Sequence, residues 1–587
     1  MKADMPSERH RLDLTLYSGV ALGVIGGSYF VAASQGWCVT SACGLLWPAS
    51  TAILLGMTTV LAAATTLTKS AQKPYLAAAA LVTVVLITLN LLPPFARDEL
   101  THHLAIPELY LKHGRAVTIP FAEQSYFPMQ LTILYTPLLA QGWESLPKQL
   151  HMLFGLGAVS ILYLYLIEKV SPAIAAFTAI LVLTTPTFVT LATSAYVDLG
   201  LLFFSTVSII ALLRWSETDR ISLLATAGFA AGCAGAVKYN GYLTIVVALA
   251  GAIALAPNKS PRILIRNALV FGLAAGLPLV PWMVRNYLDT GNPMFPLMRG
   301  MLGGPPRPDS PSVDIFTRRR FLYNESWLEV MTTPFRAFVT GRNGDPARFD
   351  GVFNPLLLLG FAALWIGRRS QPKKFLTLAA FALLLLVFLL TTFRSRYAIA
   401  SLVPLAVLTA YALDELHRSR PQADRAIAAL GAAALAFNLW HFGLYWNDVS
   451  PLGYLSGRES RSDFITRFVP EFPLSEYASQ HLPPGATVYL AFLGQRGYYW
   501  KCSYTYDFYY SGTSIRDAVR AAETPEEVAR ELKRTGISHI AAAAPLLGRF
   551  LKEDLTEKEM SRWAEFATRH LRLIRTQGAF GLYEIVS

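Results

Sequence analysis

The residues best suited to chemistry stand together near residue 100. Asp98 and Glu99 are adjacent carboxylates, and His102 and His103 follow within one turn. They come directly after an apolar run, residues 75–92, that is long enough to cross a bilayer. Ionisable groups at the mouth of a membrane span are costly unless they line water or a site. Because adjacent carboxylates suit a general base beside an orienting group or a metal ligand, this segment predicts the catalytic loop of a membrane enzyme.

Further polar side chains lie at the predicted ends of later apolar runs. In chain order they are Asp198, Lys238, Tyr239, Arg285, Arg396 and Tyr397. An ammonium at the membrane surface suits a lipid phosphate, and a guanidinium binds phosphate as a fork. Each type also has an ordinary structural role, as a helix cap for aspartate or an interfacial anchor for the cations. Their gathering on one predicted membrane face favours a shared site.

The same types of residue can also bind metal ions. His102 and His103 lack the spacing of a HExxH zinc helix, so a zinc site has weak support. A divalent metal held by Asp98, Glu99 or Asp198 is a hypothesis, and it is the only cofactor that the sequence raises. Neither a GxGxxG nor a Walker pattern occurs, so nucleotide hydrolysis has no support.

Composition places most of the chain in a membrane. Of its 587 residues, 53% are hydrophobic and 15% are charged, whereas soluble domains have about 25% charged residues. The net charge of +12 comes largely from basic linkers between apolar runs, as the positive-inside rule predicts for cytoplasmic loops. The distribution argues against nucleic acid as the partner.

The apolar runs predict a polytopic α-helical membrane protein with about 13 transmembrane helices. The expected spans are 14–31, 45–67, 75–92, 149–168, 172–191, 197–214, 221–239, 241–257, 267–284, 354–368, 374–392, 397–415 and 425–442. With a cytoplasmic N-terminus, Asp98 and Glu99 lie outside. Residues 128–143 are interpreted as an interfacial or re-entrant helix, because counting them as a span would invert the orientation of everything after them.

The spans suggest three domains. Residues 1–74 form an N-terminal transmembrane hairpin, and residues 75–442 a membrane catalytic domain with outer loops at 95–147 and 285–353. Residues 443–587 form a small extracytoplasmic α/β domain. Its expected elements are strands at 486–492 and 536–542, a helix at 524–533 that begins with a cap, and a hairpin at 571–586 that turns at Gly578.

Four cysteines are present, without a CxxC pair. Cys38 and Cys43 can form a disulfide if their loop faces an oxidising compartment, and a free pair is equally consistent with the sequence.

At these residues the chain resembles a C-type (GT-C) glycosyltransferase, of the group that contains protein O-mannosyltransferases and the lipid A aminoarabinose transferase. The resemblance covers about residues 75–415. It is carried by Asp98-Glu99, Asp198, Lys238-Tyr239, the motif from Pro281-Trp282 through Arg285-Asn286 to Pro293, and Arg396-Tyr397 followed by Pro404. The extra N-terminal pair of spans and His102-His103 depart from the best-known members.

The resemblance implies an inverting transfer of a sugar from a polyprenyl-phosphate carrier to an extracytoplasmic lipid, glycan or protein. Asp98 would be the general base, with Glu99 and Asp198 beside it. Lys238 and Arg285 would receive the departing phosphate, with Arg396 as a further candidate. The remaining substrate-binding candidates are Tyr239, Tyr397, His102 and His103. The expected location is the bacterial inner membrane, with the active site facing the periplasm or exterior.

Two other classes compete with a transferase. A transporter or a lipid-linked glycan flippase would also place charges at membrane depth, but at mid-span, with broken helices and repeat symmetry. A non-catalytic assembly subunit would use the outer domain for binding alone. Because the charged residues stand at span ends and no inverted repeat is visible, the sequence favours the transferase.

Overall fold

A computed structural model describes residues 8–67, 73–305, 314–508 and 511–586. The chain divides into two compact units, each assembled from three separate segments. The first comprises residues 1–91, 128–288 and 311–451, and the second comprises residues 92–127, 289–310 and 452–587.

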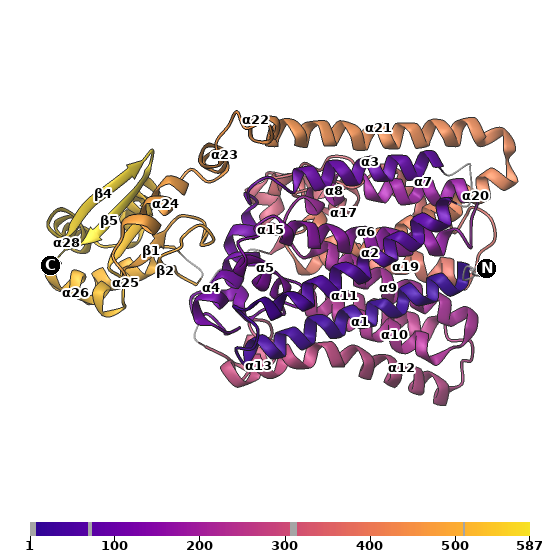
Figure 1. Ribbon diagram of the computed structural model, residues 1–587, viewed down its shortest axis with the longest axis horizontal. Helices are drawn as coiled ribbons and strands as arrows, with labels where there is room; N and C mark the ends of the chain where they lie inside the picture. The colour runs from indigo at the N-terminus through magenta and orange to yellow at the C-terminus, as the bar shows by residue number, and fades with distance from the viewer. Residues whose placement is uncertain (1–7, 68–72, 306–313, 509–510, 587) are drawn as a thin grey trace. The chain divides into compact units, whose positions relative to one another are not determined.

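The first unit is a bundle of apolar helices. Among the described residues, eight helices are long and apolar enough to cross a membrane, or nine if one pair bent by 60° is a single span. The eight are α1 (Glu8–Ser34), α2 (Leu46–Leu67), α6 (Leu146–Leu166), α9 (Asp198–Thr218), α12 (Pro261–Gly276) continued by η7 (Leu277–Leu279) and α13 (Val280–Thr290), α19 (Gln371–Leu390), η11 (Ser395–Ser401) continued by α20 (Leu402–Ser419), and α21 (Asp424–Val449). The bent pair is α7 (Pro172–Leu183) with α8 (Pro186–Ala192), and shorter apolar helices are α3 (Lys73–Leu89), α10 (Ile221–Val237) and η6 (Tyr239–Gly241) with α11 (Tyr242–Ala254). The long helices run roughly parallel to one another (Figure 1).

Helix α9 lies at the centre of this bundle. The apolar window of α9 is 94% buried, and the helix packs against α6 and α10. Helix α10 is rich in alanine and glycine, which allows close packing on α12, and a Cβ at Gly232 would clash with the carbonyl oxygen of Ala275. By contrast, the window of α21 is only 17% buried, so most of its surface is left for lipid.

The structure does not confirm the count of thirteen spans. The expected span at 354–368 holds only η10 (Pro355–Leu358) and α18 (Leu359–Ala362), and four residues cannot cross a bilayer. The side chain of Asn354 accepts a hydrogen bond from Leu356 N and donates one to Ala434 O, which starts a short turn there. Residues 128–143 contain η5 (Thr132–Tyr135) and α5 (Thr136–Ala140), which are also too short to span.

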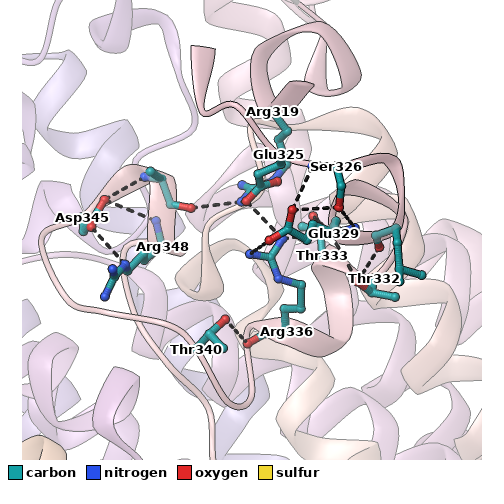
Figure 2. Close-up of polar contacts among 12 residues, drawn as sticks. Arg319, Glu325, Ser326, Glu329, Thr332, Thr333, Arg336, Thr340, Asp345 and Arg348 are labelled. Carbon is teal, nitrogen blue, oxygen red and sulfur yellow. Dashed lines mark hydrogen bonds and ion pairs between the residues drawn. The ribbon is translucent and has the colours of Figure 1, made fainter. Parts of the chain in front are cut away.

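A polar segment of the first unit, residues 314–350, is built from short helices. They are α15 (Ile315–Thr317), η8 (Arg318–Leu322), α16 (Trp327–Met331), α17 (Thr333–Arg336) and η9 (Pro346–Arg348). The buried guanidinium of Arg319 donates to Glu325, with Nε 2.6 Å from Oε2, and Arg336 approaches the same carboxylate at 3.0 Å (Figure 2). This charged cluster fixes the segment, because a buried arginine needs a hydrogen-bonded partner.

The described residues of the second unit include a five-stranded sheet with the order β2-β1-β3-β5-β4. The strands are β1 (Thr487–Ala491), β2 (Ser503–Thr505), β3 (His539–Ala543), β4 (Leu571–Gln577) and β5 (Phe580–Ile585). Strand β1 pairs parallel to β2 and β3, while β5 pairs antiparallel to β3 and β4. The two strands, the capped helix and the hairpin expected in this region are confirmed.

Helices and loops cover both faces of the sheet. The longer helices are α4 (Ala105–His113), α24 (Phe472–His481), α25 (Thr513–Ala521), α26 (Pro525–Arg534), α27 (Ala544–Asp554) and α28 (Glu557–His570). Tyr489 and Ala491 point into the core formed with α25–α28, whereas Val488 and Leu490 point into a second core. This second core also contains Leu109, Ile119 and Ala122, which lie in the outer loop expected at residues 95–147. That part of the loop therefore belongs to the α/β unit.

Candidate active site

Asp198 is the first residue of α9 and is fully buried. The turn before it is held by His151 of α6. Leu199 N donates to His151 Nε2 at 2.9 Å, so the proton lies on Nδ1, which donates to Ser194 O at 2.8 Å. One imidazole thus joins the two sides of the turn and fixes where the Asp198 carboxylate stands.

Lys238 follows the last residue of α10 and is the charge partner of Asp198. Its Nζ lies 2.9 Å from Asp198 Oδ1, and 19% of the lysine side chain is exposed. The backbone leaves the helix at Lys238 in an extended conformation and turns back at once, and a Cβ at Gly241 would clash with the backbone of Ala234. Asp198 Oδ2 is buried and makes no hydrogen bond to any described residue.

Aromatic rings and a second cation complete this group. The Nζ of Lys238 lies 4.8 Å from the centroid of the Tyr397 ring. The guanidinium carbon of Arg396 lies 5.1 Å from the same centroid and 5.0 Å from that of Tyr196. The backbone before Asp198 is held in place by Tyr135, whose hydroxyl donates to Tyr196 O at 2.6 Å. The two cations therefore flank one tyrosine face.

A loop at the end of the polar segment contacts residues 394–396 and holds them in place. Arg394 Nη1 lies 3.0 Å from Asp350 Oδ2, and Arg396 Nε lies 3.8 Å from the same oxygen. Between the two arginines, Ser395 donates its backbone N–H to Phe349 O at 2.8 Å. The loop thereby sets the orientation of η11 at its first residues.

Arg285 belongs to α13 and lies against aromatic rings. Its guanidinium carbon is 5.4 Å from the ring centroids of both Phe30 and Trp282. Its Nη2 donates to Asn286 Oδ1 at 3.3 Å, and the Asn286 side chain also hydrogen-bonds Tyr239, the neighbour of Lys238. Arg285 and Tyr239 are therefore linked through one amide.

The acidic loop belongs to the second unit. Glu99 is buried, and its Oε2 accepts the backbone N–H of Phe95 at 3.1 Å and of Ala96 at 2.9 Å. Glu99 opens η3 (Glu99–His103), a short π-helix, while Asp98 is half-buried just before it. The carboxylate of Glu99 therefore shapes the loop that presents Asp98.

The histidines of this loop lie side by side. The rings of His102 and His103 have centroids 4.0 Å apart, and His102 Nδ1 lies 2.8 Å from Thr101 Oγ1. The loop is tied to the α/β unit, because Tyr498 N donates to Leu100 O at 3.1 Å.

The chain was compared with known proteins in sequence and in fold. The family model for dolichyl-phosphate-mannose-protein mannosyltransferases matches residues 137–290. No curated protein sequence matches the chain. The apo structure of ArnT from Cupriavidus metallidurans aligns with a TM-score of 0.53 and 15% identity, over 88% of this chain and 99% of that one. The structure of the same protein bound to undecaprenyl phosphate aligns with a TM-score of 0.50 and 16% identity, over 87% and 97% of the two chains.

The chain has the GT-C fold. The structure brings together four of the residues singled out from the sequence, namely Asp198, Lys238, Arg396 and Tyr397. Tyr239 follows Lys238 in the chain, and the side chains of Tyr239 and Arg285 both hydrogen-bond Asn286. The other candidates, Asp98, Glu99, His102 and His103, form their own group in the second unit, and a cavity shared by Asp98 and Asp198 stays a prediction.

The described side chains lend no support to a divalent metal at these carboxylates. Among the described residues, no three His, Cys, Asp or Glu side chains are grouped so that they could hold an ion. Asp198 faces an ammonium that would repel a second cation, and one oxygen of Glu99 is committed to backbone donors.

Three residues of the group were not singled out from the sequence. They are His151, Tyr196 and Asp350. A histidine within an apolar span is a usable signal, since polar groups at membrane depth need a purpose. Tyr196 and Asp350 gave no such signal, because aromatic residues near span ends and acids in long loops are common.

Proposed function

We propose that this chain is an inverting glycosyltransferase that moves a sugar from a polyprenyl-phosphate carrier to an acceptor outside the cytosol. The observation that carries the proposal is the buried Asp198–Lys238 pair with Arg396 stacked beside it, at the ends of helices in a GT-C bundle. The matched ArnT structure, whose bound ligand is undecaprenyl phosphate, supports a lipid phosphate as the carrier.

The cations suit the departure of a lipid phosphate. As the sugar–oxygen bond breaks, negative charge grows on the phosphate, and positive groups fixed in advance stabilise that charge without reorganising. Asp198 fixes the Lys238 ammonium, and Asp350 helps to fix Arg396. Arg285, held against Phe30 and Trp282, adds a third cation to the same proposal.

The acceptor needs a base. A hydroxyl is a weak nucleophile, so a carboxylate must take its proton as it attacks the anomeric carbon from the face opposite the phosphate. Asp98 is our candidate for this base, supported by its position in the loop that Glu99 shapes. Asp198 already holds the Lys238 ammonium, with Oδ1 2.9 Å from Nζ, so we give it the positioning of Lys238.

We further propose that this site faces the periplasm or exterior of a bacterial inner membrane. Cys38 and Cys43 form a disulfide in the loop after α1, and disulfides persist in oxidising compartments. The same end of α1 carries Phe30, which stacks on Trp282 next to Arg285. The disulfide and Arg285 therefore lie at one end of the bundle.

A transporter or flippase is less well supported. Such a protein would hold its charged groups at mid-span on broken helices. Here Asp198 is the first residue of α9, Lys238 follows the last residue of α10, and Arg396 is the second residue of η11.

The test is a transfer assay with purified full-length chain. It uses a radiolabelled polyprenyl-phosphate sugar and separates the free lipid phosphate from the intact donor. Release of lipid phosphate by the wild type, and its loss in Lys238→Gln, is the expected result. Equal release by both proteins would contradict the role of Lys238, and no release with any carrier-linked sugar would contradict the transferase.

A further inference from the structure

A pocket of about 650 Å³ lies in the first unit, away from the Asp198–Lys238 pair in sequence. It is formed by residues 336–349 of the polar segment and by the last two turns of α21. Its polar lining comprises Arg336, Arg342, Asn343, Arg348, His441 and Asp448. We call it the Arg342 pocket. Three arginines against one acid make its lining positive.

The three arginines are not equally engaged. Arg336 turns toward Glu325, 3.0 Å away, and its charge is balanced inside the cluster (Figure 2). Arg348 points away from that cluster and reaches Asp345 only at 3.8 Å, with 64% of its side chain exposed. The guanidinium of Arg342 is exposed and makes no hydrogen bond or ion pair with the described part of the chain. Arg342 and Arg348 therefore leave positive charge for a ligand.

Acceptor groups stand beside these cations. Asn343 Oδ1 is buried and has no hydrogen-bond partner among residues that the structure describes. An orphaned buried acceptor is costly, and a donor from a ligand would relieve that cost. Asp448 adds a carboxylate to the lining. The pocket therefore offers guanidinium forks for an anion and oxygen acceptors for a neighbouring hydroxyl or ammonium.

Exposed apolar side chains lie at the Arg342 pocket and beside it on α21. Val339 is 53% exposed and Leu444 is 40% exposed, and Trp440, one turn before Leu444 on α21, is 67% exposed. Because α21 is one of the candidate spans and most of its surface is unburied, these side chains meet acyl chains. A ligand at this place thus has a charged head and an apolar tail.

We propose that the Arg342 pocket binds the phosphate headgroup of a membrane lipid whose headgroup also carries a hydroxyl or an ammonium. The phosphate meets Arg342 and Arg348, and the donor group meets Asn343 and Asp448. The apolar tail leaves past Val339 and Leu444. Binding requires no chemical step and holds whether or not the chain transfers a sugar.

Binding at this pocket has a structural consequence for the candidate site. Phe349 lines the pocket, and its carbonyl accepts the backbone N–H of Ser395, the residue before Arg396. The next residue, Asp350, holds Arg394. A lipid that orders this loop therefore also orders η11.

The experiment places the purified full-length chain in phosphatidylcholine nanodiscs with a few per cent of phosphatidylglycerol. Native mass spectrometry after gentle release counts the bound phosphatidylglycerol. The test variant is Arg342→Gln/Arg348→Gln, and the matched control is Arg368→Gln/Arg425→Gln, which removes the same charge from exposed arginines outside the pocket. Each arginine near an anionic lipid raises the affinity by a factor of about five, so the test variant, which lacks two of them, should lose about 30-fold in affinity. The control keeps wild-type affinity.

Three outcomes overturn the proposal. Equal loss in the control shows general attraction, and equal occupancy by phosphatidylcholine, whose quaternary ammonium has no N–H to donate, shows that the pocket does not recognise a hydrogen-bond donor in the headgroup. Displacement by millimolar inorganic phosphate shows a site for free phosphate instead of a lipid. If the double variant fails to fold, Asn343→Asp gives the second test. A carboxylate there repels the phosphate, so affinity falls, and unchanged affinity contradicts the pocket.

Discussion

Removing the ammonium of Lys238 tests the central pair most directly. In Lys238→Ala the carboxylate of Asp198, which is fully buried, loses the partner 2.9 Å away. At an effective dielectric constant of about 20, that attraction is worth about 6 kcal/mol. Part is offset because the lysine must be desolvated, and breaking buried pairs usually costs about 3–5 kcal/mol. Since Lys238 keeps some contact with solvent, we expect a loss of about 3 kcal/mol in the free energy of unfolding.

A second variant separates stability from catalysis. Asp198→Asn/Lys238→Gln removes both charges and leaves two amides that can hydrogen-bond each other. We expect its free energy of unfolding to return to within about 1 kcal/mol of the wild type. Release of lipid phosphate should stay lost, because no ammonium meets the departing charge.

Both quantities are measured on full-length protein in detergent micelles, by denaturant titration and by the transfer assay. Lys374→Ala is the control, since this lysine is exposed and its loss should change stability by about 0.5 kcal/mol or less. A loss below 1 kcal/mol in Lys238→Ala would refute the reasoning about burial. Full transfer by the double variant would remove Lys238 from phosphate stabilisation.

Three further predictions concern other parts of the chain. Asp98→Asn should reduce transfer by about 10²–10⁴-fold at an unchanged amount of membrane-bound protein, and wild-type transfer would exclude Asp98 as the base. In a Cys502→Ser background, an impermeant maleimide should label intact cells only after a reductant has opened the Cys38–Cys43 disulfide, and labelling before reduction would contradict it. Hydrogen bonds from Thr556 hold the pKa of the Glu559 carboxyl below its ordinary value of 4.5, so its stabilising effect is present above that value and is lost as the pH falls through the lowered pKa. The gap in urea midpoint between wild type and Glu559→Gln should therefore be larger at pH 6 than at pH 3, and a constant gap would count against this role.

Local patterns predicted local structure well. The side chain of Thr524 caps α26 by accepting from Glu527 N at 3.3 Å, and Gly578 turns the final hairpin with a positive φ of 55°. Strand β2 escaped prediction because it has only three residues and exists through parallel pairing with β1. Residues 354–368 were misjudged since apolar composition alone does not reveal the short turns that break the segment.

In the candidate site too, features set by the local sequence could be predicted, whereas contacts between distant residues could not. Asp198 was expected to open a span, and it does, because the position follows from the apolar run after it. Its pairing with Lys238 joins residues 40 positions apart on separate helices, which no spacing rule encodes. The contact of Asp350 with Arg394 depends on how a long loop folds back, and it was invisible for the same reason.

The second core of the sheet is built from two segments that are far apart in the chain and are therefore synthesised at different times. Leu109, Ile119 and Ala122 emerge from the ribosome at least 330 residues (452 − 122) before the segment that starts at residue 452 and contains their partners. At typical translation speeds of about 5–20 residues per second, that delay is roughly 15–65 s. During this interval the early loop has apolar side chains and no partner surface, which makes it a natural client for a chaperone. A tail expressed alone from residue 452 should precipitate, and adding a peptide of residues 92–127 should keep it in solution.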